Sequence, residues 1–146
     1  MPDLTAFSLV SLYTLLALIG VLSVLILGFQ VQVFRGKRMP NPDGSADDWH
    51  EQKVFYGIAV ADILFACPLG FAVVTLVLMG SPWGFFLLPV HGFYFLWANT
   101  MTTTTSLRFH NPKFTVMWFI VFPLGILVGA ATLIWSAIHL ISLYAA

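Results

Sequence analysis

The chain has 146 residues, of which 60% are hydrophobic and only 8% are charged, and its formal net charge is zero. A soluble domain carries about a quarter charged residues, so most of this surface must face lipid rather than water. The balanced charge gives no indication of nucleic-acid binding. The single cysteine, Cys67, excludes an intramolecular disulfide and a metal site built from several thiolates.

Four apolar runs are long enough to cross a bilayer as helices. They cover approximately residues 7–34, 54–79, 84–107 and 114–144. No lysine or arginine precedes the first run, and its core exceeds the ~7–15 residues of a secretory signal, so we expect it to be a retained span. The expected fold class is therefore all-α: one domain, residues 1–146, forming a four-helix transmembrane bundle.

The basic residues predict how this bundle is oriented. All of them flank residues 35–53 or residues 108–113, and none lies in the connection between the second and third runs or at either terminus. The positive-inside rule places these two loops in the cytoplasm and both termini on the non-cytoplasmic side. We expect an integral membrane protein, with the bacterial inner (cytoplasmic) membrane as its location.

The first of these loops combines a turn, "PNPDG", with a possible helix start, "SADDWHE". Asp48 and Glu51 have the spacing of a capping box. The candidate metal ligands on the cytoplasmic side are Asp47, Asp48, His50, Glu51 and His110. Carboxylates with histidines suit a divalent ion, but a helix cap followed by a solvated face explains the same residues.

Asp62, in the second run, is the one acid or base well inside a predicted span. Placing a carboxylate there costs at least ~2.5–3.5 kcal/mol on insertion scales, and such residues are usually functional. Asp62 lies nine residues from Lys53, and Asn99 lies nine residues from Arg108. Both residues therefore lie about 13 Å from the cytoplasmic ends of their spans. This equal depth predicts one polar layer in the core of the bundle.

The predicted ligand- or ion-binding residues are Asp62, Asn99, Thr103, Ser106, Ser23 and His91. The alternative is structural, with Asp62 acting as a hydrogen-bonded acid that holds the second and third spans together. His91 and His139 are both predicted in the outer third of the bundle, where two histidines could meet. A closed metal site needs three or four ligands, so hydrogen-bonded histidines are the more common explanation.

Small residues mark the expected helix contacts. Ala66 and Gly70 share a face with Asp62, and Gly125 and Gly129 form a GxxxG motif in the fourth run. The motif leaves open whether that run packs within one chain or between copies. Proline inside three of the runs predicts local kinks.

Three classes of function remain, and the sequence leaves any cofactor unknown. The first is an oligomeric transporter, channel or ligand-binding bundle that uses the layer around Asp62 and Asn99. The second is a non-catalytic subunit of a larger membrane complex. The third is a membrane enzyme acting on a lipophilic substrate, which ranks last because no nucleophile and base pair is evident. The expected partners are the lipid bilayer and further copies or other membrane subunits.

Overall fold

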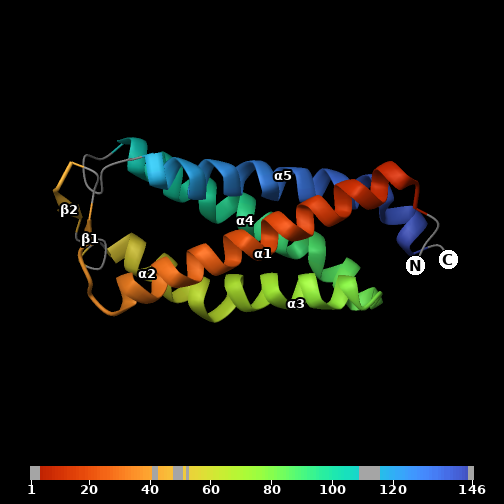
Figure 1. Cartoon of the computed structure of the whole chain (residues 1–146), viewed down its shortest axis with the longest axis horizontal. Helices are drawn as coiled ribbons and strands as arrows, with labels where there is room; N and C mark the ends of the chain where they lie inside the picture. The colour runs from red at the N-terminus through yellow and green to blue at the C-terminus, as the bar shows by residue number, and fades with distance from the viewer. Residues whose placement is uncertain (1–3, 41–42, 48–50, 52, 109–115, 145–146) are drawn as a thin grey trace.

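The computed structural model describes residues 4–40, 43–47, 51, 53–108 and 116–144. Nearly all of them are helical, and the helices lie alongside one another in an elongated bundle (Figure 1).

The helices form four rods. The elements are α1 (Ala6–Phe34), α2 (Lys53–Ala61), η2 (Asp62–Ala66), α3 (Cys67–Leu78), α4 (Pro82–Arg108) and α5 (Val116–Tyr144). The second rod joins α2 and α3 through η2, one stretch of wider π-helix. Each rod begins and ends within two residues of a predicted apolar run. Long apolar runs become helices in lipid because a helix satisfies its own backbone hydrogen bonds.

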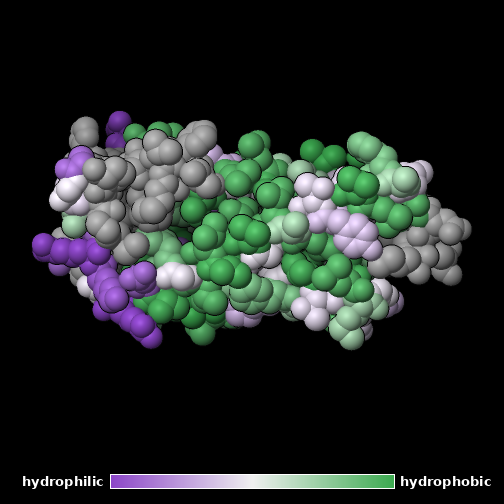
Figure 2. Space-filling model, in the orientation of Figure 1, coloured by the Kyte–Doolittle hydropathy of each residue, from purple (hydrophilic) through white to green (hydrophobic). Residues whose placement is uncertain are grey.

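Three rods are long and apolar enough to cross a membrane: Ala6–Phe34, Lys53–Leu78 and Val121–His139. Less than half of each span is buried inside the chain, so large apolar side chains face outward. Figure 2 shows this apolar surface along the bundle, with hydrophilic residues gathered at one end. These are the properties of a membrane protein. The helix α4 is not among the three, so the fourth span remains a prediction.

The helix α1 has well-defined caps at both ends. At its start, the Thr5 hydroxyl accepts a hydrogen bond from the Ser8 backbone N–H at 3.2 Å. At its end, Gly36 adopts φ 70°, and the Lys37 N–H donates to the Gln32 carbonyl at 3.0 Å. This is a Schellman motif, which requires the left-handed conformation that glycine adopts without strain. The helix therefore ends at Gly36, where the chain leaves the axis of α1.

The first loop contains a small hairpin that the sequence patterns did not predict. Strand β1 (Met39–Pro40) pairs antiparallel with β2 (Ala46–Asp47). The Asp43 carboxylate accepts from the backbone N–H and the hydroxyl of Ser45, at 3.0 and 2.6 Å, which stabilises the turn. Asp48, half of the predicted capping box, lies outside the described residues.

The wide turn η2 has a local chemical cause. Pro68 is the second residue after it and has no backbone N–H, so its α-helical bond to the carbonyl four residues earlier cannot form. The Cys67 N–H instead donates to the Asp62 carbonyl, five residues back. The turn therefore changes the helical register at Asp62.

Glycines bring α4 and α5 together, and this is the most extensive helix pair of the bundle. A Cβ on Gly129 would lie 2.5 Å from the Leu96 backbone nitrogen and 2.8 Å from the Gly92 carbonyl oxygen. A Cβ on Gly125 would lie 2.5 Å from Cγ of Asn99. The GxxxG face therefore packs within the chain, with Gly129 against the backbone of α4 and Gly125 against the Asn99 side chain.

Candidate functional site

Asp62 lies at the first position of η2 and is buried, with 7% of its surface exposed. Two other rods donate hydrogen bonds to its carboxylate. Gln30 Nε2 of α1 donates to Oδ2 at 2.6 Å, and Tyr94 Oη of α4 donates to Oδ1 at 3.2 Å. A carboxylate has about four lone-pair positions, so two donors leave capacity for further donors or a cation. Asp62 therefore connects three rods.

Asn99 and Ser23 do not join Asp62 in the described structure. The Asn99 amide donates to the Phe95 carbonyl of its own helix at 2.8 Å and lies against Gly125 of α5. Ser23 lies beside Gly70 of α3. The polar layer predicted from equal depth is therefore not formed, although all of these side chains are buried.

Rotation about the helix axis explains the difference. Tyr94 and Asn99 are five residues apart, which turns them about 140° away from each other on a helix of 3.6 residues per turn. Tyr94 therefore faces η2 while Asn99 faces α5. The residue counts from Lys53 and Arg108 predict how deep Asp62 and Asn99 lie in the membrane. They do not predict which neighbouring helix each side chain faces.

Neither Gln30 nor Tyr94 is among the binding residues predicted from the sequence. A signal for Gln30 existed, because it is an amide in the last two turns of an otherwise apolar run. Gln32, two residues on, is also polar, so the sequence alone does not distinguish a buried amide from the polar end of the helix.

A second polar cluster joins Ser23 of α1, Gly70 of α3 and His91 of α4. The His91 ring is fully buried and packs on Phe95, with ring centroids 4.5 Å apart. His91 Nε2 lies 3.0 Å from the position that a Cβ on Gly70 would take, and the Ser23 hydroxyl lies closer still. Neither His91 nitrogen, nor the Ser23 hydroxyl, has a hydrogen-bond partner among the described residues. Only glycine at position 70 leaves room for both side chains.

Further buried hydroxyls lie along α4 and α5. They belong to Thr103, Ser106, Thr132 and Ser136, and the structure gives them no partner within its described part. The neighbouring Thr102 hydroxyl differs, because it donates to the Ala98 carbonyl of its own helix at 2.9 Å. The bundle interior is thus lined with polar groups at several levels.

At the bundle end where α1 begins and α5 ends (Figure 1), a hydrogen-bond network joins these two helices. His139 Nδ1 bonds the Trp135 carbonyl at 2.8 Å, and its Nε2 bonds the Ser8 hydroxyl at 2.9 Å. Trp135 Nε1 donates to the Ser11 hydroxyl at 3.1 Å. Both His139 nitrogens have partners here, so His139 and His91 do not form the shared site considered from the sequence.

The candidate metal ligands of the first loop are only partly described. Asp47 is buried in β2 and Glu51 is exposed, whereas Asp48, His50 and His110 lie outside the described residues. Within the described ranges, no three histidine, cysteine, aspartate or glutamate residues form a group that would hold a metal ion. The metal site on the cytoplasmic side remains a prediction.

Comparison of the chain with protein-family models, with curated proteins and with solved structures finds no match. Its function is therefore inferred from the geometry around Asp62 and from the polar groups of the bundle interior.

Proposed function

We propose that the protein is a small membrane transporter or channel that binds a proton or small cation at Asp62. The observation that supports this most strongly is a buried carboxylate with hydrogen-bond donors from two other rods, in a chain that is otherwise apolar. An ionisable residue inside a span is costly and is usually retained for a functional reason.

The backbone at Asp62 supports the same proposal. Asp62 begins a π-helical turn, and such turns occur frequently at functional sites.

The unpartnered polar groups of the interior also support it. Along α4, His91 precedes Tyr94, whose hydroxyl reaches Asp62, and Thr103 and Ser106 follow it. Buried polar groups without protein partners are commonly satisfied by internal water, and an unpaired polar group in hydrocarbon is costly. A proton or hydrated cation fits an interior of this composition.

The proposal requires α4 to cross the membrane as a fourth span, and the distribution of its side chains favours that. Apart from Arg108 at its last position, its exposed large residues are apolar: Trp83, Phe86, Val90, Phe93, Trp97 and Leu107. Its buried residues include His91, Asn99 and Thr103. A mean hydropathy averages the two faces, so a span with a polar inner face is missed by that measure.

The test is ion flux into liposomes reconstituted with the purified protein. We expect proton or cation flux in the wild type and a loss of at least tenfold in Asp62→Asn, because the amide cannot carry the negative charge. Asp43→Asn is the matched control, since it removes an exposed acid of the hairpin turn and leaves the interior unchanged. Circular dichroism and gel filtration check that each variant is folded.

Three outcomes would contradict the proposal. They are no flux in the wild type, normal flux in a folded Asp62→Asn variant, or an equal loss of flux in Asp43→Asn.

Native mass spectrometry of gently extracted protein separates the transporter from the subunit of a larger complex. A fixed-ratio complex with other polypeptides would favour the non-catalytic subunit, whereas a homo-oligomer would favour the transporter.

A further inference from the structure

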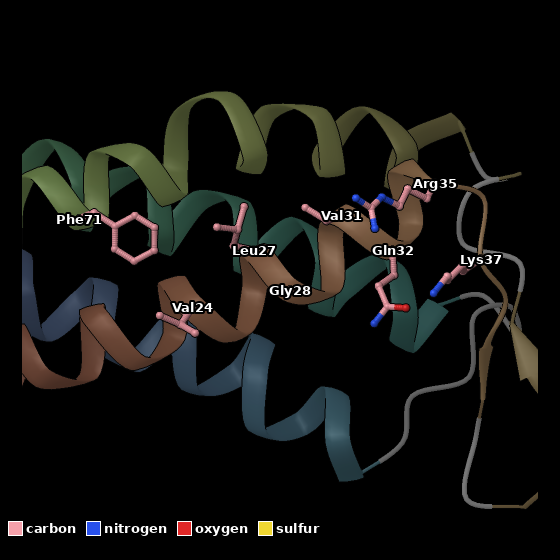
Figure 3. Close-up of a pocket in the computed structure, with 8 residues that line it drawn as sticks. All are labelled: Val24, Leu27, Gly28, Val31, Gln32, Arg35, Lys37 and Phe71. Atoms are coloured by element: carbon pink, nitrogen blue, oxygen red, sulfur yellow. The ribbon is translucent and has the colours of Figure 1, made fainter.

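A groove of about 460 Å³ runs along the exposed side of α1. Figure 3 shows the residues that line it. Its walls are apolar and come from Val24 and Leu27 of α1 and Phe71 of α3. Its centre is Gly28, which is exposed, and a Cβ added there would meet no atom within 4 Å. The missing side chain at position 28 is what keeps the groove open.

The other end of the groove is basic and polar. Arg35, Lys37 and Gln32 line it, and both cations are exposed. Neither cation has an ion-pair partner within the described part of the chain. The Schellman motif at Gly36 ends α1, and Figure 3 shows the Lys37 side chain pointing back toward this helix. The local fold therefore gathers two positive charges and an amide at one end of an apolar groove.

The length of the groove matches one leaflet of a bilayer. Val24 lies eleven residues before Arg35, which is about 16 Å along a helix. Half of a hydrocarbon core is about 15 Å thick. With Arg35 and Lys37 at headgroup level, the apolar part of the groove reaches the middle of the membrane.

We propose that this groove binds one anionic glycerophospholipid. Its phosphate pairs with Arg35 and Lys37, the Gln32 amide donates to an ester oxygen, and one acyl chain lies over Gly28 against Phe71. The charge favours this occupant over a zwitterionic lipid or an apolar partner helix, because two unpaired cations at the surface attract anionic headgroups. The proposal is independent of ion transport through Asp62.

The experiment is native mass spectrometry of the full chain in detergent, titrated with phosphatidylglycerol or phosphatidylcholine. We expect one phosphatidylglycerol to bind the wild type with clear preference over phosphatidylcholine. Each basic residue near an anionic lipid surface contributes roughly a fivefold factor in affinity. The double variant Arg35→Gln/Lys37→Gln should therefore bind phosphatidylglycerol about 30-fold more weakly and lose the preference. The control Lys53→Gln/Arg108→Gln removes two cations outside the groove and should keep the preference for phosphatidylglycerol.

A second variant pair tests the apolar part. Gly28→Leu fills the groove without meeting the rest of the chain, so we expect at least tenfold weaker binding of both lipids. Gly57→Leu is the matched control, because Gly57 is another exposed helical glycine with open space around it. The proposal fails if Gly28→Leu and Gly57→Leu bind phosphatidylglycerol equally, if Arg35→Gln/Lys37→Gln keeps the preference, or if the wild type shows none.

Discussion

Gln30 and Tyr94 contribute unequally to holding Asp62. The bond from Gln30 Nε2 is short at 2.6 Å, and both of its side chains are buried. The bond from Tyr94 Oη is 3.2 Å long, beyond the usual range of about 2.5–3.0 Å for O–H···O bonds. At the scale of single residues, Gln30 should therefore be the more important partner of the carboxylate.

Replacing Gln30 with methionine tests this ranking. Gln30→Met keeps the length of the side chain but leaves Asp62 Oδ2 without its donor, so the free energy of unfolding should fall by about 1–3 kcal/mol. Tyr94→Phe should reduce it by less. Thermal unfolding in detergent micelles, followed by circular dichroism, measures both variants.

Gln32→Met is the control, because Gln32 lies two residues further along α1 and is exposed. Its effect on the free energy of unfolding should stay within about 0.5 kcal/mol. If Tyr94→Phe proved more destabilising than Gln30→Met, the order of the two bonds would be reversed.

At the scale of helices, α4 and α5 depend on glycine for their close approach. The Leu96 backbone nitrogen lies 2.5 Å from the position that a Cβ on Gly129 would take. A backbone atom cannot rotate away as a side chain can, so any larger residue must push the two helices apart.

Gly129→Ala should therefore lower the free energy of unfolding by about 1–3 kcal/mol, as overpacking does in other cores. Gly57→Ala, at a position with open space, should be neutral or stabilising by up to about 1 kcal/mol, because alanine favours a helix more than glycine does. Melting temperatures of the two variants in the same detergent give the comparison. Equal melting temperatures would mean that α4 and α5 do not pack as tightly as the structure has them.

At the scale of the whole molecule, four antiparallel rods bring the start of α1 and the end of α5 together (Figure 1). The bond between Ser8 and His139 stabilises this arrangement. Ends that meet on one side of a bundle require an even number of crossings, so the geometry favours α4 as a span.

Labelling single cysteines with a membrane-impermeant maleimide tests the number of crossings. In a Cys67→Ala background, Thr5→Cys and Met79→Cys should be labelled from outside intact cells, because the positive-inside rule places both positions there. Asp43→Cys should be labelled only after the cells are opened. A cysteine appended after the last residue decides the fourth span. Labelling of this cysteine from outside intact cells would mean that α4 crosses the membrane. Its protection from labelling would mean that α4 does not cross.

The positions of the four rods were predictable because they depend on a local property. Each run is apolar over enough residues to favour a helix in lipid, whatever it packs against. The predicted limits 7–34 and 54–79 differ from Ala6–Phe34 and Lys53–Leu78 by one residue or none at each end. The hairpin of the first loop escaped prediction, because its two strands are only two residues long and carry no alternating pattern.

The sequence by itself determined the class of the protein, the extent of its helices and the presence of one acid inside an apolar run. The tertiary structure decided which residues surround that acid. Contact between helices depends on the rotation of each rod about its axis, and packing sets that rotation. Asp62 therefore meets Gln30 and Tyr94 rather than Asn99. The groove beside Gly28 likewise arises only where α1, α3 and the turn at Gly36 come together.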